Sequence, residues 1–116
     1  MQSILNKFRK KKDTSKISVY EDSGSINLLI NTERFDFTTH ASFHNAYRGR
    51  NSRSKYIIDF SKVKVMDRSA LGMLLMLREQ NGSNMKHIEL VNCSNEILYT
   101  LSNAKFDKLF TIKPLV

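Results

Sequence analysis

The sequence predicts an α/β domain with a mixed sheet of four or five strands and three main helices packed on it. Its centre is a β-branched apolar run at residues 56–60, typical of a buried strand, followed by a helical pattern at 69–80. A short apolar strand at 87–91 completes a βαβ unit, whose strands are parallel and whose crossover is right-handed. Alternating segments at 16–21 and 25–32, joined by Asp-Ser-Gly, predict a β-hairpin before this unit.

The length and composition fit one domain with a single hydrophobic core. The chain has 116 residues, of which 41% are hydrophobic and 26% are charged. No apolar run is long enough to span a bilayer, and no apolar segment follows the N-terminal basic residues as it would in a secretory signal. Cys93 is the only cysteine and cannot form an internal disulfide, so a reducing cytoplasm is the expected compartment.

Positive charge is concentrated locally. The formal net charge is +8, and nine of the nineteen Lys and Arg residues fall in two short stretches. These nine are Lys7, Arg9, Lys10, Lys11, Lys12, Arg48, Arg50, Arg53 and Lys55. We interpret residues 1–14 as a basic, flexible N-terminal extension and residues 15–116 as the domain. The extension is expected to be a solvated tail; the alternative is a weak contact with a membrane surface or nucleic acid.

The segment 35–48 predicts a helix with Thr38 or Thr39 as its capping residue. Its apolar residues at core spacing are Phe43, Ala46 and Tyr47. His40 and His44 are four residues apart, a spacing that can hold zinc, but no nearby cysteine or carboxylate completes a site. No metal site is therefore predicted.

The C-terminal segment is predicted to complete the fold with one more helix and an edge strand. Ser94 or Asn95 caps this helix, and the strand falls at 111–112 before Pro114. The apolar residues expected to close the core are Ile97, Leu98, Leu101, Phe106, Leu109 and Phe110.

No catalytic motif stands out. The sequence has no Gly-rich phosphate loop, no convincing nucleophile–base–acid set and no metal-ligand cluster, so we expect neither enzyme activity, nor a cofactor, nor a small-molecule substrate. Ser69 has two interpretations. Ser69, or Asp67 two residues before it, can cap the helix at 69–80, which is the simpler physical interpretation. Ser69 can also accept a phosphate, which would add about −1.5 to −2 charges at the positive end of that helix, beside Arg68.

The residues around Ser69 carry a family resemblance. The segment Asp67-Arg68-Ser69-Ala70-Leu71-Gly72, between a strand and an apolar helix, resembles the D-S-S-G-L-G signature of the STAS domain family, which includes the bacterial anti-sigma factor antagonists. The order of elements over about residues 16–113 also fits, and residues 102–110 are similar to the end of such domains. Arg68 and Ala70 depart from the signature, and Arg68 leaves Ser69 as the only hydroxyl in the turn.

The resemblance implies a cytoplasmic partner switch that regulates transcription. The unphosphorylated antagonist binds an anti-sigma factor, usually a serine kinase, and so releases the sigma factor. The kinase phosphorylates Ser69, beside the motif acid Asp67, and a metal-dependent Ser/Thr phosphatase reverses this step. The residues expected to contact the partner are Asp67, Arg68, Ser69, Ala70, Leu71 and Met73. The basic loop at 48–55 is expected to contribute to the same surface. Met73 or Met76 is expected to be partly exposed, a position suited to adaptable contacts.

Two alternatives belong to other functional classes. The first is a constitutive STAS scaffold subunit of a signalling complex, in which Ser69 is only a helix cap. The second is a basic nucleic-acid-binding module that uses the tail and the loop at 48–55. The second is disfavoured because no aromatic stacking residues are interleaved with the basic ones and no reading helix is recognisable.

Overall fold

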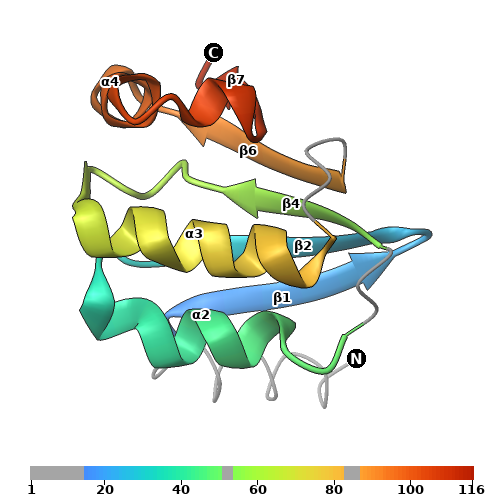
Figure 1. The fold of residues 1–116 in the computed structure, drawn as a ribbon. Helices are drawn as coiled ribbons and strands as arrows, with labels where there is room; N and C mark the ends of the chain where they lie inside the picture. Colours follow the sequence, from blue (N-terminus) through green and yellow to red (C-terminus); the bar gives the residue numbers. More distant parts are fainter. Residues whose placement is uncertain (1–14, 51–53, 83–86) are drawn as a thin grey trace.

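The computed structural model describes residues 15–50, 54–82 and 87–116, and in it five strands form one mixed sheet in the order β1-β2-β4-β6-β7 (Figure 1). The strands are β1 (Ile17–Asp22), β2 (Ser25–Ile30), β4 (Lys55–Asp59), β6 (Ile88–Cys93) and β7 (Thr111–Pro114). Only the β1–β2 pair is antiparallel, whereas β2–β4, β4–β6 and β6–β7 are parallel. The predicted α/β class and mixed sheet are therefore confirmed.

Three α-helices pack on this sheet. They are α2 (His40–Tyr47), α3 (Arg68–Gln80) and α4 (Asn95–Asn103). Helices α2 and α3 lie side by side across one face of the sheet, and α4 lies beside β6 and β7 (Figure 1). Two 3-10 turns, Phe37–Thr39 and Phe106–Lys108, precede α2 and β7. A two-stranded parallel sheet joins β3 (Arg34–Phe35) to β5 (Val65–Met66), close to the start of α3.

The core lies between the sheet and the helices. The residues that each strand or helix contributes to it are those whose side chains repeat on the inward face of that element. Alternate residues of a strand point to the same face, so Leu28, Ile58 and Leu90 stand opposite one another on neighbouring strands and are fully buried. The buried residues of α3 follow the helical period: Ala70, Met73, Leu74 and Leu77. The hairpin turn contains Gly24 at φ +82°, a conformation that glycine adopts at little cost.

The structure corrects the predicted start of α2. A 3-10 turn, Phe37–Thr39, precedes α2, and Asp36 caps this turn, because its carboxylate accepts a hydrogen bond from the Thr38 backbone N–H at 3.0 Å. Thr39 stands at the N-cap position of α2 without a side-chain capping bond, and its hydroxyl instead donates to the Asp36 carbonyl at 2.6 Å. The predicted flexible extension at 1–14 lies outside the described residues. Within the described ranges, no helix is both long and apolar enough to cross a membrane.

Candidate functional site

The turn that leads into α3 is organised by Asp67. After β5 the backbone at Asp67 is extended, with φ −116° and ψ −173°, and α3 begins at the next residue. Asp67 Oδ1 accepts a hydrogen bond from the Ala70 backbone N–H at 3.2 Å, so Asp67 is the N-cap. The carboxylate satisfies one of the free amides of the first turn and also places a negative charge at the positive end of the helix.

Ser69 is the second residue of α3 and does not cap it. Its hydroxyl donates to Asp67 Oδ1 at 2.6 Å, and the side chain is partly exposed. The carboxylate that caps the helix therefore also fixes the orientation of the hydroxyl. The arrangement holds a hydroxyl oxygen at the surface, with its proton directed toward a fixed acceptor and its lone pairs free for an incoming electrophile.

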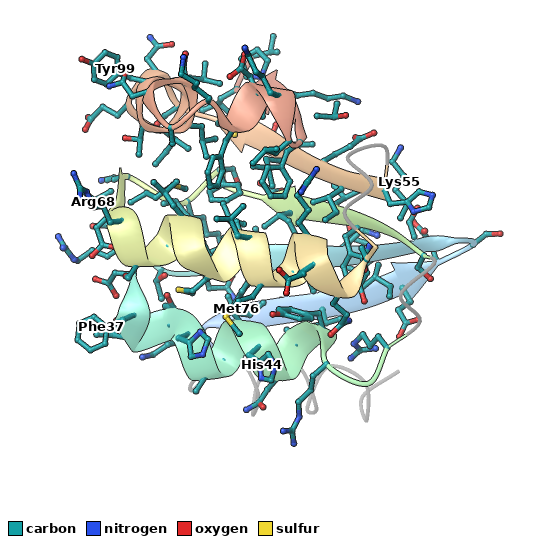
Figure 2. All side chains as sticks on the ribbon, viewed as in Figure 1. Phe37, His44, Lys55, Arg68, Met76 and Tyr99 are labelled. Carbon is teal, nitrogen blue, oxygen red and sulfur yellow. The ribbon has the colours of Figure 1, made fainter. Side chains whose placement is uncertain are left out.

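Arg68, the first residue of α3, projects from the end of the helix into solvent (Figure 2). Of the ion pairs formed within 15–50, 54–82 and 87–116, none includes Arg68. The guanidinium group next to Ser69 is thus available to a carboxylate or phosphate group.

The predicted partner-contact residues divide between the surface and the core. Asp67 and Arg68 are exposed, and Ser69 and Leu71 are partly buried. Ala70 and Met73 are buried, with Met73 only 4% exposed, so the expectation that these two side chains contact a partner is wrong. They lie on the inward stripe of α3 because positions 70, 73, 74 and 77 repeat at helical spacing. Of Met73 and Met76, Met76 is the one exposed at the surface, at 48% (Figure 2).

An open groove of about 500 Å³ lies beside this turn, between the first part of α3 and the second half of α4. Its lining residues are Met66, Asp67, Arg68, Leu71, Tyr99, Thr100, Asn103 and Ala104. Tyr99, which is 69% exposed on α4, was not among the candidate residues predicted from the sequence. The available signal was a large aromatic residue on the polar side of a helix whose inward residues are Ile97 and Leu101.

The basic loop and the histidine pair lie outside this turn. Arg50 forms an ion pair with Glu21, and Lys55 Nζ lies 2.6 Å from Glu89 Oε2, so both cations are partly neutralised within the domain. Residues 51–53 of this loop are outside the described ranges. The rings of His40 and His44 stack with centroids 6.0 Å apart. Among the described residues, no group of three or more potential metal ligands surrounds them or lies elsewhere.

Together these features define an α/β domain with a partly exposed serine in the first turn of a helix, beside an open groove. The chain belongs to the STAS domain family: the family model described as "Mlab, STAS domain" matches residues 22–114. A STAS-domain containing protein of Pseudomonas aeruginosa (strain UCBPP-PA14) is 41% identical over 80 residues, which cover 68% of this chain and 79% of that protein.

Solved structures of anti-sigma factor antagonists share the fold. A candidate anti-sigma factor antagonist from Thermotoga maritima superposes with a TM-score of 0.72 at 16% identity, covering 86% of this chain and 87% of that one. An anti-sigma-factor antagonist (STAS) domain protein from Planctomyces limnophilus gives 0.72 at 16% identity, covering 84% and 89%. The antagonist SpoIIAA in its unphosphorylated form gives 0.56 at 14% identity, covering 83% and 86%. The identification of the family and fold from the sequence is confirmed.

Proposed function

We propose that this protein is an anti-sigma factor antagonist that works as a partner switch controlled by phosphorylation of Ser69. The observation that carries the proposal is the geometry of the turn, in which the Ser69 hydroxyl is partly exposed and held by the Asp67 carboxylate at the start of α3. Membership of the STAS family and the likeness to antagonist structures support it.

In the unphosphorylated state, the first turn of α3 binds an anti-sigma factor that carries a serine kinase domain, and the sigma factor is released. The kinase then transfers the γ-phosphoryl group of ATP. Ser69 Oγ forms a bond to the γ-phosphorus, the bond from that phosphorus to the bridging oxygen of ADP breaks, and the hydroxyl proton is released. Asp67 acts as a positioning residue here, because its hydrogen bond holds the hydroxyl in one orientation.

The phosphate acts on the partner surface and leaves the domain folded. It adds about −1.5 to −2 charges at a helix N-terminus, where the macrodipole and Arg68 compensate part of the new charge. The Ser69 hydroxyl can no longer donate to Asp67, and the two negative groups repel each other. The partner-facing surface therefore changes from a hydrogen-bonded turn with a free cation to a densely anionic one. A metal-dependent Ser/Thr phosphatase in the same cytoplasm hydrolyses the phosphoserine and resets the switch.

The test is a binding titration of wild type, Ser69→Ala and Ser69→Asp against each purified anti-sigma factor kinase encoded in the same genome. Intact mass is measured after ATP is added. We expect wild type and Ser69→Ala to bind and Ser69→Asp to lose binding, with only wild type gaining one phosphate. Ser23→Asp is the matched control, because it adds the same charge in the exposed β1–β2 turn, at the end of the sheet away from the start of α3 (Figure 1).

Equal binding of all variants, with no phosphate on Ser69, would refute the switch. The protein would then be a constitutive scaffold subunit. Loss of binding in Ser23→Asp as well would show that added negative charge acts through the net charge of the protein and not at this turn.

A further inference from the structure

The outer side of α4 carries an aromatic residue that neither the core nor the proposed phosphorylation site uses. Tyr99 is 69% exposed, and within the described part of the chain it forms no side-chain hydrogen bond and no aromatic contact. Figure 2 shows Tyr99 at the same end of the molecule as Arg68, one on α4 and the other on α3. Both residues line the groove between these helices. Exposed tyrosine that can be covered by a partner is a frequent anchor of protein interfaces.

The floor of the groove is apolar and continues along α3. Met66, Leu71 and Ala104 are among its lining residues. Leu75 is four positions after Leu71 on the same side of α3 and is 41% exposed, so it extends the apolar strip beyond the groove. An exposed apolar strip that starts in a groove and continues along one helix matches a surface that receives the apolar face of a partner helix.

The charged residues at the mouth of the groove indicate the charge that a bound segment would carry. Asp67 Oδ1 is already engaged by the Ser69 hydroxyl and the Ala70 amide, so its charge is partly satisfied within the turn. Arg68 has no carboxylate partner among the described residues. The chain as a whole carries a net charge of +8. A segment that brings carboxylates to this mouth would gain both a specific pair with Arg68 and general attraction.

We propose that the groove between α3 and α4 receives an acidic amphipathic helix of the anti-sigma factor. Tyr99 is its aromatic anchor, and Arg68 is its ionic anchor. This inference rests on the proposed function and extends the partner surface from the turn at Ser69 to α4. The volume of about 500 Å³ suits a few apolar side chains from successive turns of such a helix.

This surface also explains how one phosphate can release the partner. Ser69 follows Arg68 directly in the chain, so a phosphate on Ser69 competes with the partner carboxylate for the guanidinium group. The same phosphate repels the carboxylate across the mouth of the groove. Arg68 therefore pairs with the partner before phosphorylation and with the phosphate afterwards.

The experiment is a titration of the full chain with the purified anti-sigma factor kinase that binds wild type, at two salt concentrations. We expect Tyr99→Ala to weaken binding by about tenfold or more, as the loss of a central aromatic anchor does. Tyr20→Ala is the matched control, because Tyr20 is similarly exposed, at 61% against 69% for Tyr99, but lies on strand β1. We expect this substitution to change binding less than about twofold. Arg68→Ala is expected to weaken binding and to reduce its dependence on salt.

The outcomes separate this inference from the proposed function. If wild type binds and Ser69→Asp does not, but Tyr99→Ala binds as wild type does, the groove is excluded and the switch stands. If wild type binds none of the kinases, both proposals are wrong. Amide NMR of the labelled chain gives a second readout that does not depend on a variant. Shifts at Leu71, Leu75 and Asn103 on adding the kinase support the groove, and shifts confined to α2 and the β1–β2 turn overturn it.

Discussion

A stability comparison of Asp67→Ala with Ser69→Ala tests the central geometric claim, that Asp67 caps α3 and Ser69 is free of a structural role. In the structure, Asp67 Oδ1 accepts bonds from the Ala70 N–H at 3.2 Å and from the Ser69 hydroxyl at 2.6 Å. Ser69 itself accepts no capping bond from a first-turn amide among the described hydrogen bonds. The two substitutions should therefore have very different effects on the free energy of unfolding.

Asp67→Ala removes a side-chain cap, which costs about 1 kcal/mol within a range of roughly 0.5–2 kcal/mol. It also removes a carboxylate from the positive end of α3, which costs about 0.3–1 kcal/mol more. The expected loss is about 1–2 kcal/mol. Ser69→Ala removes one partly exposed hydrogen bond, worth about 0.5 kcal/mol at the low end of the usual range. The better helix propensity of alanine offsets about the same amount, so the net change is near zero.

Urea denaturation followed by far-UV circular dichroism measures both values. We expect the midpoint of Asp67→Ala to fall with an unchanged slope, since the surface exposed on unfolding stays the same. For a domain of this size, 1 kcal/mol corresponds to a drop of roughly 4 °C in the melting temperature. Asp67→Asn is the control, because asparagine is an equally good cap and only the charge is lost.

If Ser69→Ala is as destabilising as Asp67→Ala, the assignment of Asp67 as the cap of α3 is wrong. Ser69 would then hold the end of α3, and a phosphate at that position would unfold the first turn instead of changing only the partner surface. If neither substitution has an effect, the hydrogen bonds of this turn do not contribute to stability, and Asp67 cannot be said to position the hydroxyl.

Three further outcomes follow from other parts of the fold. The hydrogen bond from Lys55 lowers the pKa of the Glu89 carboxyl group below its ordinary 4.5. The ionised carboxylate therefore stabilises the fold fully above this pH, and its contribution is lost as the pH falls through the lowered pKa. Below pH 4.5, the free energy of unfolding of Glu89→Gln should vary less with pH than that of wild type. Burial raises the pKa of the Cys93 thiol to about 12. We therefore expect a thiol reagent at neutral pH to leave Cys93 of the folded protein unlabelled and to label it fully in urea. Rapid labelling of the folded protein would contradict the burial of Cys93 in the core. Leu74→Ala, at a fully buried site, should lower the free energy of unfolding in urea by about 2–5 kcal/mol. Leu75→Ala, on the exposed side of α3, should lower it by less than about 1 kcal/mol. Equal losses would mean that α3 is rotated about its axis.

Much of the fold could be predicted because the deciding signals are local. The alternation in β2 places Ile26, Leu28 and Ile30 on one face whatever strand lies beside it. The change from a strand pattern to a helical pattern before residue 68 located the βαβ unit to within one residue of the observed start of α3. Asp67 was recognised as a potential cap because Asp before an apolar helix is a strong N-terminal signal.

The orientation of α3 was not predictable from its own residues. Five apolar residues run in succession from Met73 to Leu77, and such a run surrounds the helix axis without marking an inward side. Met73 and Leu74 are buried in the core, while Leu75 and Met76 remain exposed. Burial is a property of the neighbours of a residue, so a sequence-based argument could not assign Met73 to the core.

Local sequence patterns were enough to predict the order of the elements, the inward faces of the strands and the turn that contains Ser69, because each depends on interactions between residues a few positions apart. Which surfaces meet around that turn depends instead on the packing of distant segments. Tyr99 is thirty positions from Ser69, and it lies on the groove beside it because the chain that follows β6 places the second half of α4 next to the start of α3. The pairing of Lys55 with Glu89 across β4 and β6 was likewise set by strand register. Contacts between distant segments depend on how the elements pack, and no local pattern records them.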